Sequence, residues 1–169
     1  IHAPVSGKVK EVEGVALASS GKVAAVTIAN DGEDTPYDGF GVDTDPDTLS
    51  PEEMIERVRN AGIVGLGGAT FPSHVKLAPP KEKPIETVIV NGAECEPLLT
   101  CDYRLMMETP ETMIRGADLV RKMVGAKRLI LATEDNKRDI AQLLEKKVGE
   151  LGIDAEVMVA KTKYPQGGE

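Results

Sequence analysis

Three segments of the chain carry apolar residues at helical spacing. A helix that buries one face shows such a stripe with a period of 3.6 residues, so the pattern predicts three amphipathic helices. They cover residues 51–61, residues 110–124 and a segment that begins near Asn136. The apolar stripes are Met54, Ile55 and Val58; Met113, Ile114, Ala117, Val120, Met123 and Val124; and Ile140, Leu143, Leu144 and Val148.

The ends of these helices are marked by capping residues. Ser50 is a suitable N-cap, Pro51 suits the first helical position, and Glu53 is placed to complete a capping box. Gly62 and Gly125 follow the first two stripes, where a left-handed residue commonly ends a helix. Thr109-Pro110 opens the second helix.

Between the helices lie short apolar runs without alternation. They are Thr87–Asn91, Arg128–Ala132 and a run after Gly152 that includes Val157 and Val159. A strand of this kind is typical of a sheet with both faces covered. Strands that alternate with helices over short connections predict an α/β fold with a parallel sheet and flanking helices. Ligands bind beyond the carboxyl ends of such strands, and Asn91 lies at one of them.

The first part of the chain has a different pattern. Residues 4–28 read as two or three short β-strands, interrupted at Gly14 and turning at Ser19-Ser20-Gly21. Residues 31–49 hold seven acidic residues and no Lys or Arg, which favours a solvated linker over a calcium loop. We therefore divide the chain into a β region (1–30), an acidic linker (31–49) and an α/β domain (50–169).

Composition limits the possible functions. The net charge is −8 and no stretch concentrates Lys and Arg, so nucleic acid is not expected as a partner. No apolar run approaches the roughly 18 residues of a membrane span. Cys95 and Cys101 are too few for a disulfide framework or a four-ligand metal site, and we interpret both as small apolar residues in a reducing compartment. The start at Ile1 and the end at Glu169, just after a strand, suggest a piece of a longer protein truncated at its C-terminal end.

The segment Gly62–Pro72 is the strongest candidate for binding chemistry. Glycines at 62, 65, 67 and 68 leave backbone N–H groups uncovered, so they can converge on an anion or approach a flat ring. The segment is neither a dinucleotide fingerprint nor a P-loop, because Thr70 stands where the third glycine belongs and no Gly-Lys-Ser/Thr occurs. A phosphate or cofactor cradle and a plain glycine-rich connector both remain open from composition.

Two strand exits carry further polar groups. Asn91-Gly-Ala-Glu-Cys-Glu-Pro97 offers Glu94 and Glu96 as acceptors for ribose or ribityl hydroxyls, against the simpler interpretation of a polar loop. Lys161–Glu169 is a second exit that ends in glycines. A parallel sheet brings both exits to one edge, so we expect the three segments to face one rim.

These motifs together resemble a known family. Gly65-Leu-Gly-Gly-Ala-Thr-Phe-Pro72, Lys76, Asn91–Pro97 and Tyr164-Pro-Gln-Gly-Gly-Glu169 occur in the order typical of the C subunits of Rnf complexes, the membrane-bound ferredoxin:NAD oxidoreductases. His2–Gly7 and Glu134–Lys137 fit the same family. The family is related to the FMN- and NADH-binding subunit of respiratory complex I. The resemblance implies a Rossmann-like domain preceded by a partial barrel-sandwich, lipoyl-like region.

The resemblance also implies roles for individual residues. FMN phosphate and ring would lie against Gly65, Gly67, Gly68 and Ala69, with Lys76 paired to phosphate and Asn91 and Glu94 on the flavin side. Phe71 would stack near the nicotinamide and Glu96 would contact the NADH ribose. Tyr164, Gly167, Gly168 and Glu169 would close the other face of the ring. Leu66 and Ala93 depart from the complex I relative, which has Arg and Asp there.

The function implied by the resemblance is electron transfer between NAD(H) and iron–sulfur clusters through FMN, coupled to ion translocation by partner subunits. The [4Fe–4S] clusters would lie outside residues 1–169, because two cysteines cannot ligate them. No catalytic side chain and no metal ligand is assigned. We expect a peripheral subunit on the cytoplasmic face of the membrane, held by other subunits. A soluble flavoprotein of the cobalamin-reductase type, and a docking module with an incomplete flavin site, are the alternatives.

Overall fold

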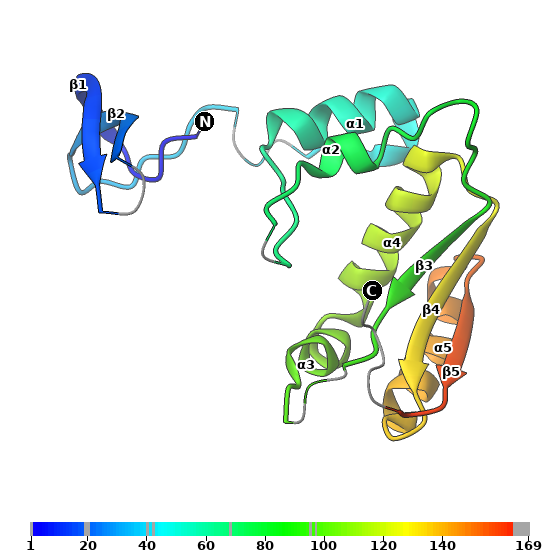
Figure 1. Ribbon diagram of the computed structural model, residues 1–169. Helices are drawn as coiled ribbons and strands as arrows, with labels where there is room; N and C mark the ends of the chain where they lie inside the picture. The colour runs from blue at the N-terminus through cyan, green and yellow to red at the C-terminus, as the bar shows by residue number, and fades with distance from the viewer. Residues whose placement is uncertain are drawn as a thin grey trace. The chain divides into compact units, whose positions relative to one another are not determined.

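The computed structural model describes residues 2–18, 21–39, 41, 43–67, 69–94, 96 and 98–163. The chain forms two compact units, Ile1–Thr44 and Asp45–Glu169. Helices of the second unit cover a parallel sheet, as the sequence pattern predicts (Figure 1).

The first unit is built on an antiparallel hairpin. Strand β1 (Gly7–Leu17) pairs with β2 (Gly21–Asn30), with Val12 opposite Val26 and an irregularity between Val9 and Glu11. The sequence pattern predicts an interruption at Gly14. This prediction is wrong, because Gly14 lies within β1, opposite Ala24. The two predicted turn residues Ser19 and Ser20 lie outside the described residues.

The second unit begins with the last residues of the predicted linker. Pro46–Thr48 form the short 3-10 helix η1, which Asp45 caps by accepting a hydrogen bond from the Asp47 N–H. The Asp47 carboxylate accepts a hydrogen bond from Lys122 Nζ at 2.6 Å. Helix α1 (Pro51–Asn60) follows, and a connector leads to the short helix α2 (Ser73–Lys76).

Three parallel strands form the sheet of the second unit, in the order β3 (Thr87–Asn91), β4 (Arg128–Glu134), β5 (Glu156–Ala160). Helices α3 (Cys101–Glu108) and α4 (Pro110–Val124) connect the first two strands, and α5 (Arg138–Leu151) connects the last two. The three strands point toward the end of the unit where α3 lies (Figure 1). Their carboxyl ends therefore meet at that edge.

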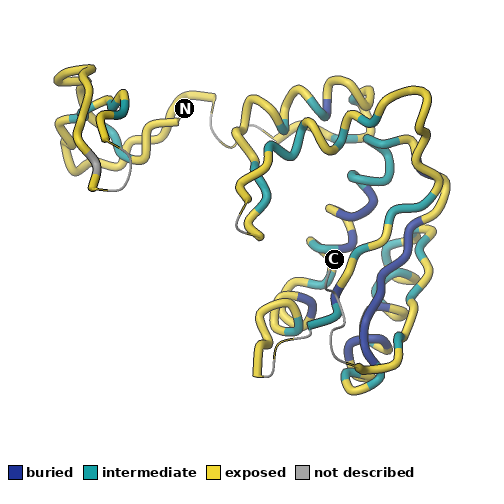
Figure 2. Tube along the Cα trace, in the orientation of Figure 1, coloured by how far each residue is buried: buried dark blue, intermediate teal, exposed yellow. Residues whose placement is uncertain are grey.

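The core lies between the sheet and the two long helices. Leu129 and Leu131 of β4 pack with Ile114 of α4 and with Ile140 and Leu144 of α5 in one cluster. Figure 2 shows this continuous buried stretch along β4. The cluster is mainly aliphatic, as expected from a chain with 3% aromatic residues.

The sequence pattern predicts that both faces of the sheet are covered, and for strand β3 this expectation is wrong. Ile89, in the middle of β3, is 58% exposed, whereas its neighbours Val88 and Val90 pack against the core. Because α4 and α5 join the same core cluster, they cover the same face of the sheet. Ile89 and the 40%-exposed Met158 of β5 lie on the opposite face.

Helix α1 is capped as the sequence predicts. The Ser50 hydroxyl accepts a hydrogen bond from the Glu53 N–H at 3.3 Å, and Glu53 Oε2 accepts one from the Ser50 N–H at 2.8 Å. These bonds from Ser50 lower the pKa of the Glu53 carboxyl. Gly62, in the turn after α1, has a φ of +67°, and Gly125 ends α4 with a φ of +69°.

Replacing Ser50 by alanine is expected to lower the free energy of unfolding by about 1 kcal/mol, because the first turn of α1 loses a side-chain acceptor for its backbone N–H groups. Urea unfolding followed by circular dichroism at 222 nm measures the change. Ser50→Asp supplies another good N-cap and should remain close to the wild type. Equal losses in both variants would contradict the capping role.

Candidate functional site

The glycine-rich segment forms a closed loop between α1 and α2. Gly65 N–H donates to the Phe71 carbonyl at 2.9 Å, and Ser73 N–H donates to the Ile63 carbonyl at 3.0 Å. Val64 and Pro72 form an antiparallel bridge at the neck of the loop. The Gly65 amide is therefore already bonded, so an anion at this loop would be bound by other N–H groups than that of Gly65.

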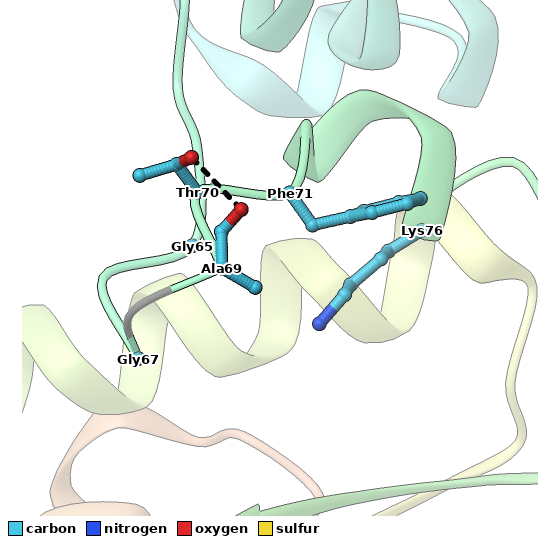
Figure 3. Close-up of a pocket in the computed structure, with 6 residues that line it drawn as sticks. All are labelled: Gly65, Gly67, Ala69, Thr70, Phe71 and Lys76. Atoms are coloured by element: carbon cyan, nitrogen blue, oxygen red, sulfur yellow. Dashed lines mark hydrogen bonds between the residues drawn. The ribbon is translucent and has the colours of Figure 1, made fainter. Parts of the chain in front are cut away.

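A cavity of about 420 Å³ opens beside this loop. Its volume falls in the range of roughly 300–1,000 Å³ that is typical of small-molecule sites. The cavity brings together five predicted site residues and one that sequence reasoning missed, Thr70 (Figure 3). Its lining is Gly65, Gly67, Ala69, Thr70, Phe71 and Lys76. Gly68 lies outside the described residues.

Lys76 and Phe71 supply the charge and the ring of this cavity. Lys76 Nζ lies 5.7 Å from the centroid of the Phe71 ring, which is a cation–π distance. Figure 3 shows the two side chains side by side, with the amine end of Lys76 turned toward the loop that carries Ala69. A cation beside an aromatic face suits a ligand with a phosphate and a flat ring.

Absence of a side chain at Gly67 keeps the loop open. A Cβ built at Gly67 meets no heavy atom within 4 Å, and one at Gly65 meets only the Phe71 carbonyl oxygen at 3.8 Å. Neither glycine is therefore required by packing within the protein. Both positions leave room for a ligand to approach the backbone.

Thr70 has an uncommon backbone conformation. Its φ is +50°, a region that a β-branched residue rarely adopts, and its hydroxyl donates to the Ala69 carbonyl at 2.8 Å. Strain of this kind costs of order 1–3 kcal/mol and clusters at ligand sites. No sequence signal predicts a positive φ at a threonine, so this feature emerges only from the structure.

A second group of polar residues lies at the carboxyl edge of the sheet. Gly92 N–H donates to the Ala132 carbonyl of β4 at 2.9 Å, and Asn91 Oδ1 accepts from the Ala93 N–H at 3.1 Å. A Cβ at Gly92 would lie 2.9 Å from both the Ala132 oxygen and Met106 Sδ. Only a glycine therefore lets the turn after β3 lie this close to β4.

Glu94 is held inside the protein at this edge. Its side chain is 1% exposed and accepts hydrogen bonds from Lys137 Nζ at 2.7 Å, from the Asp102 N–H at 2.8 Å and from the Tyr103 N–H at 3.3 Å. Burial raises the pKa of the Glu94 carboxyl, but the bonds from Lys137 and the backbone outweigh it and hold this pKa below its ordinary value. In this arrangement Glu94 caps the start of α3. Its predicted contact with a flavin stays a prediction.

Glu134 and Lys137 complete this network. Lys137 Nζ lies 3.2 Å from Glu134 Oε2, and the same oxygen accepts a bond from the Glu94 N–H at 3.3 Å. Burial lowers the pKa of Lys137, but its bonds to Glu94 and Glu134 raise it above the ordinary value. Both residues lie at or just after the end of β4. Ligands gather at the carboxyl ends of parallel strands, so the argument used for Asn91 would have indicated Glu134 and Lys137 as candidate site residues.

Cys101 does not fit its interpretation as a small apolar residue. It is exposed, and its thiol donates to Glu94 Oε1 at 3.6 Å. Ligand atoms of Glu94, Cys101 and Asp102 lie within 4.8 Å of one another. Both oxygens of Glu94 accept hydrogen bonds from this part of the protein, so the capping of α3 accounts for the position of this group.

The remaining predicted residues are not brought into the loop cavity. Asn91 and Glu96 are exposed near the sheet edge, and neither they nor Glu94 belong to the cavity lining. Tyr164, Gly167, Gly168 and Glu169 lie outside the described residues. The expectation that the glycine-rich segment and the two strand exits face one rim of the sheet therefore stays a prediction.

Comparison with known proteins identifies the family. The family model described as the Nuo51 FMN-binding domain matches residues 58–169. The chain belongs to this FMN-binding family. The match includes the loop cavity and the whole parallel sheet.

Relatives of this chain include proteins of the predicted kind. The C subunit of the proton-translocating ferredoxin:NAD(+) oxidoreductase complex of Clostridium ljungdahlii is 41% identical over 169 residues, which are 100% of this chain and 36% of that protein. The C subunit of the Na(+)-translocating ferredoxin:NAD(+) oxidoreductase complex of Acetobacterium woodii is 46% identical over 175 residues, with 100% of this chain and 38% of that protein covered. The resemblance to Rnf C subunits is confirmed. The chain spans little more than a third of the length of these relatives.

A solved structure supports the fold. A chain of the "NAD+-reducing [NiFe]-hydrogenase in the H2-reduced state" superposes with a TM-score of 0.60 and 24% identity, covering 69% of this chain and 22% of that one. The predicted α/β fold with a parallel sheet and flanking helices is confirmed. Among the described residues, no helix combines the length and the apolar character needed to cross a membrane.

Proposed function

We propose that this chain binds FMN at the glycine-rich loop and forms the flavin-binding part of an ion-translocating ferredoxin:NAD oxidoreductase subunit. The observation that carries the proposal is the cavity in which an open glycine backbone lies beside the cation of Lys76 and the ring of Phe71. The family match over residues 58–169 supports FMN as the ligand. When bound, FMN supplies hydride exchange with NAD(H) and release of single electrons.

The residues of the chain would bind and orient the cofactor. Lys76 would pair with the phosphate, and the backbone at Gly67 and Ala69 would allow close approach of phosphate and ring. Phe71, which is 44% exposed, offers a face for the nicotinamide, and the exposed Glu96 offers acceptors for the NADH ribose. Gly68, Tyr164, Gly167, Gly168 and Glu169 would complete the site.

The wider assignments follow from the same proposal. Iron–sulfur clusters and ion translocation would belong to other parts of the longer protein and to partner subunits, with this subunit peripheral on the cytoplasmic face. The hairpin of β1 and β2 would be part of a barrel-sandwich, lipoyl-like region. The acidic stretch 31–49 would join it to the flavin domain.

Replacing Gly67 by valine is expected to weaken FMN binding at least tenfold, about 1.4 kcal/mol, because the new side chain fills space that the ligand needs. Quenching of flavin fluorescence on titration of the apo full-length protein measures the dissociation constant. Unfolding in urea should be unchanged, since a Cβ at Gly67 meets no atom within 4 Å.

Gly116→Val is the matched control for this variant. Gly116 lies in α4, and a Cβ there also meets no atom within 4 Å. We expect wild-type FMN affinity in this control. Unchanged flavin affinity in the Gly67 variant would contradict the proposed site.

A further inference from the structure

One lysine links the turn after β3 to the end of β4 and to the start of α5. Lys137 directly precedes α5, and its Nζ contacts Glu94 on the turn at 2.7 Å and Glu134 at the end of β4 at 3.2 Å. All three side chains are largely inaccessible, with Lys137 13% exposed and both glutamates 1% exposed. Asn91 and Glu96, the predicted contacts for FMN and NADH, lie on either side of Glu94 in the sequence.

Lys137 offsets one of the two negative charges in this cluster. Two carboxylates and one ammonium give a net charge of −1, and without the ammonium the net charge becomes −2. Two carboxylates that share a buried site cannot both remain ionised at little cost, so one takes up a proton or they separate. Separation would release the turn, because Glu94 N–H is bonded to Glu134 and the Glu94 carboxylate holds the Asp102 and Tyr103 amides.

Other groups around the cluster are few in the described part of the chain. From α3 the groups facing Glu94 are the thiol of Cys101, the two backbone amides and the side chain of Asp102, which lies beside that thiol. From α5, Asp139 accepts a hydrogen bond from the Tyr103 hydroxyl at 2.7 Å. Lys137 is the only cation that these contacts bring to the two carboxylates.

We propose that Lys137 is a positioning residue for the cofactor site: its ammonium lies between two buried carboxylates and so holds residues 92–94, in the turn after β3, against β4. This rests on the proposed FMN function. Its action is electrostatic, so it depends on the total charge of the cluster and not on the shape of the lysine.

Lys137→Met is therefore expected to weaken FMN binding about tenfold at pH 8 and progressively less toward pH 6, where a proton replaces the lost charge. The FMN phosphate, with a second pKa of about 6, titrates in the same range, so the loss is read at each pH as the ratio of the variant's dissociation constant to that of the wild type. The double variant Glu134→Gln/Lys137→Met restores a net charge of −1, and its FMN affinity at pH 8 should return to within about threefold of the wild type. Flavin fluorescence titration of the full-length protein gives each dissociation constant.

Lys147→Met is the matched control, since Lys147 lies within α5 and, like Lys137, pairs with two carboxylates, at 2.7 Å and 2.9 Å, but away from the turn. It should leave affinity and pH profile unchanged. A pH-independent loss in Lys137→Met that Glu134→Gln does not rescue, or no loss at all, would overturn the positioning role.

Amide hydrogen exchange separates this proposal from the proposed function. In the absence of FMN, Lys137→Met should increase exchange in residues 92–94 and at the start of α3 at least tenfold at pH 8, and the double variant should reverse it. If the wild type does not bind FMN but exchange behaves in this way, the function fails and the positioning role stands. Unchanged exchange in Lys137→Met would refute the positioning role whether or not FMN binds.

Discussion

Replacing Leu131 by alanine is expected to lower the free energy of unfolding of the unit Asp45–Glu169 by about 2–5 kcal/mol. Leu131 lies in the central strand β4, is 1% exposed and packs in the cluster that joins the sheet to α4 and α5. Truncation removes buried apolar contacts and leaves a cavity that the surrounding helices can fill only in part. Urea unfolding followed by circular dichroism at 222 nm measures the loss.

Leu66→Ala is the control with the same chemical change. Leu66 lies on the glycine-rich loop and is 94% exposed, so its truncation should change the free energy of unfolding by no more than about 0.5 kcal/mol. A loss below 1 kcal/mol in the Leu131 variant would contradict the assignment of β4 to the centre of the core.

Local signals explain why most of the second unit could be predicted from the sequence. The stripe of α4, its proline start and its glycine end are all encoded within a short stretch of chain, and α4 indeed spans Pro110–Val124. The apolar run predicts the strand at 128–132, and β4 extends it to Glu134. In these elements, propensity, periodicity and capping agree with the tertiary environment.

Helix α3 shows where local signals fail. Its N-cap residue Thr100 makes no side-chain capping bond, and the amides of Asp102 and Tyr103 bond instead to Glu94, eight and nine residues away. A cap supplied from a preceding turn has no sequence spacing that would predict it. The exposure of Ile89 escapes prediction for a related reason, because an apolar strand does not specify on which face the helices pack.

Some features of the candidate site could also be predicted from the sequence, and others could not. The glycine-rich loop could be predicted because glycine content alone indicates accessible backbone, and its cavity includes Lys76 and Phe71 as expected from the family resemblance. The pair of Glu94 and Lys137 is separated by 43 residues, so only the parallel register of β3 and β4 brings it together. The positive φ of Thr70 likewise has no counterpart in composition or spacing.

Replacing Glu94 by alanine is expected to lower the free energy of unfolding by about 1–3 kcal/mol near pH 7, the cost typical of leaving buried hydrogen-bond donors without their acceptor. Lys137 loses its shorter contact, and the first amides of α3 lose their acceptor. Glu156→Ala is the control, because Glu156 pairs with Arg128 at 3.0 Å but is 59% exposed, so about 0–1 kcal/mol is expected.

The pH dependence of this loss tests its electrostatic origin. The pKa of Glu94 is lower in the folded protein than its ordinary value, so the folded state binds this proton more weakly than the unfolded chain. The stabilisation is therefore fully present above the ordinary glutamate pKa of about 4.3 and is lost as the pH falls through the folded pKa. Carboxylates outside this cluster are common to both proteins and cancel in the difference between wild type and Glu94→Ala. That difference, measured by urea unfolding between pH 7 and pH 3, should stay constant down to about pH 5 and then shrink. A difference that is the same at pH 3 and pH 7 would mean that Glu94 acts through packing alone, and the ionised cluster at the sheet edge would be wrong.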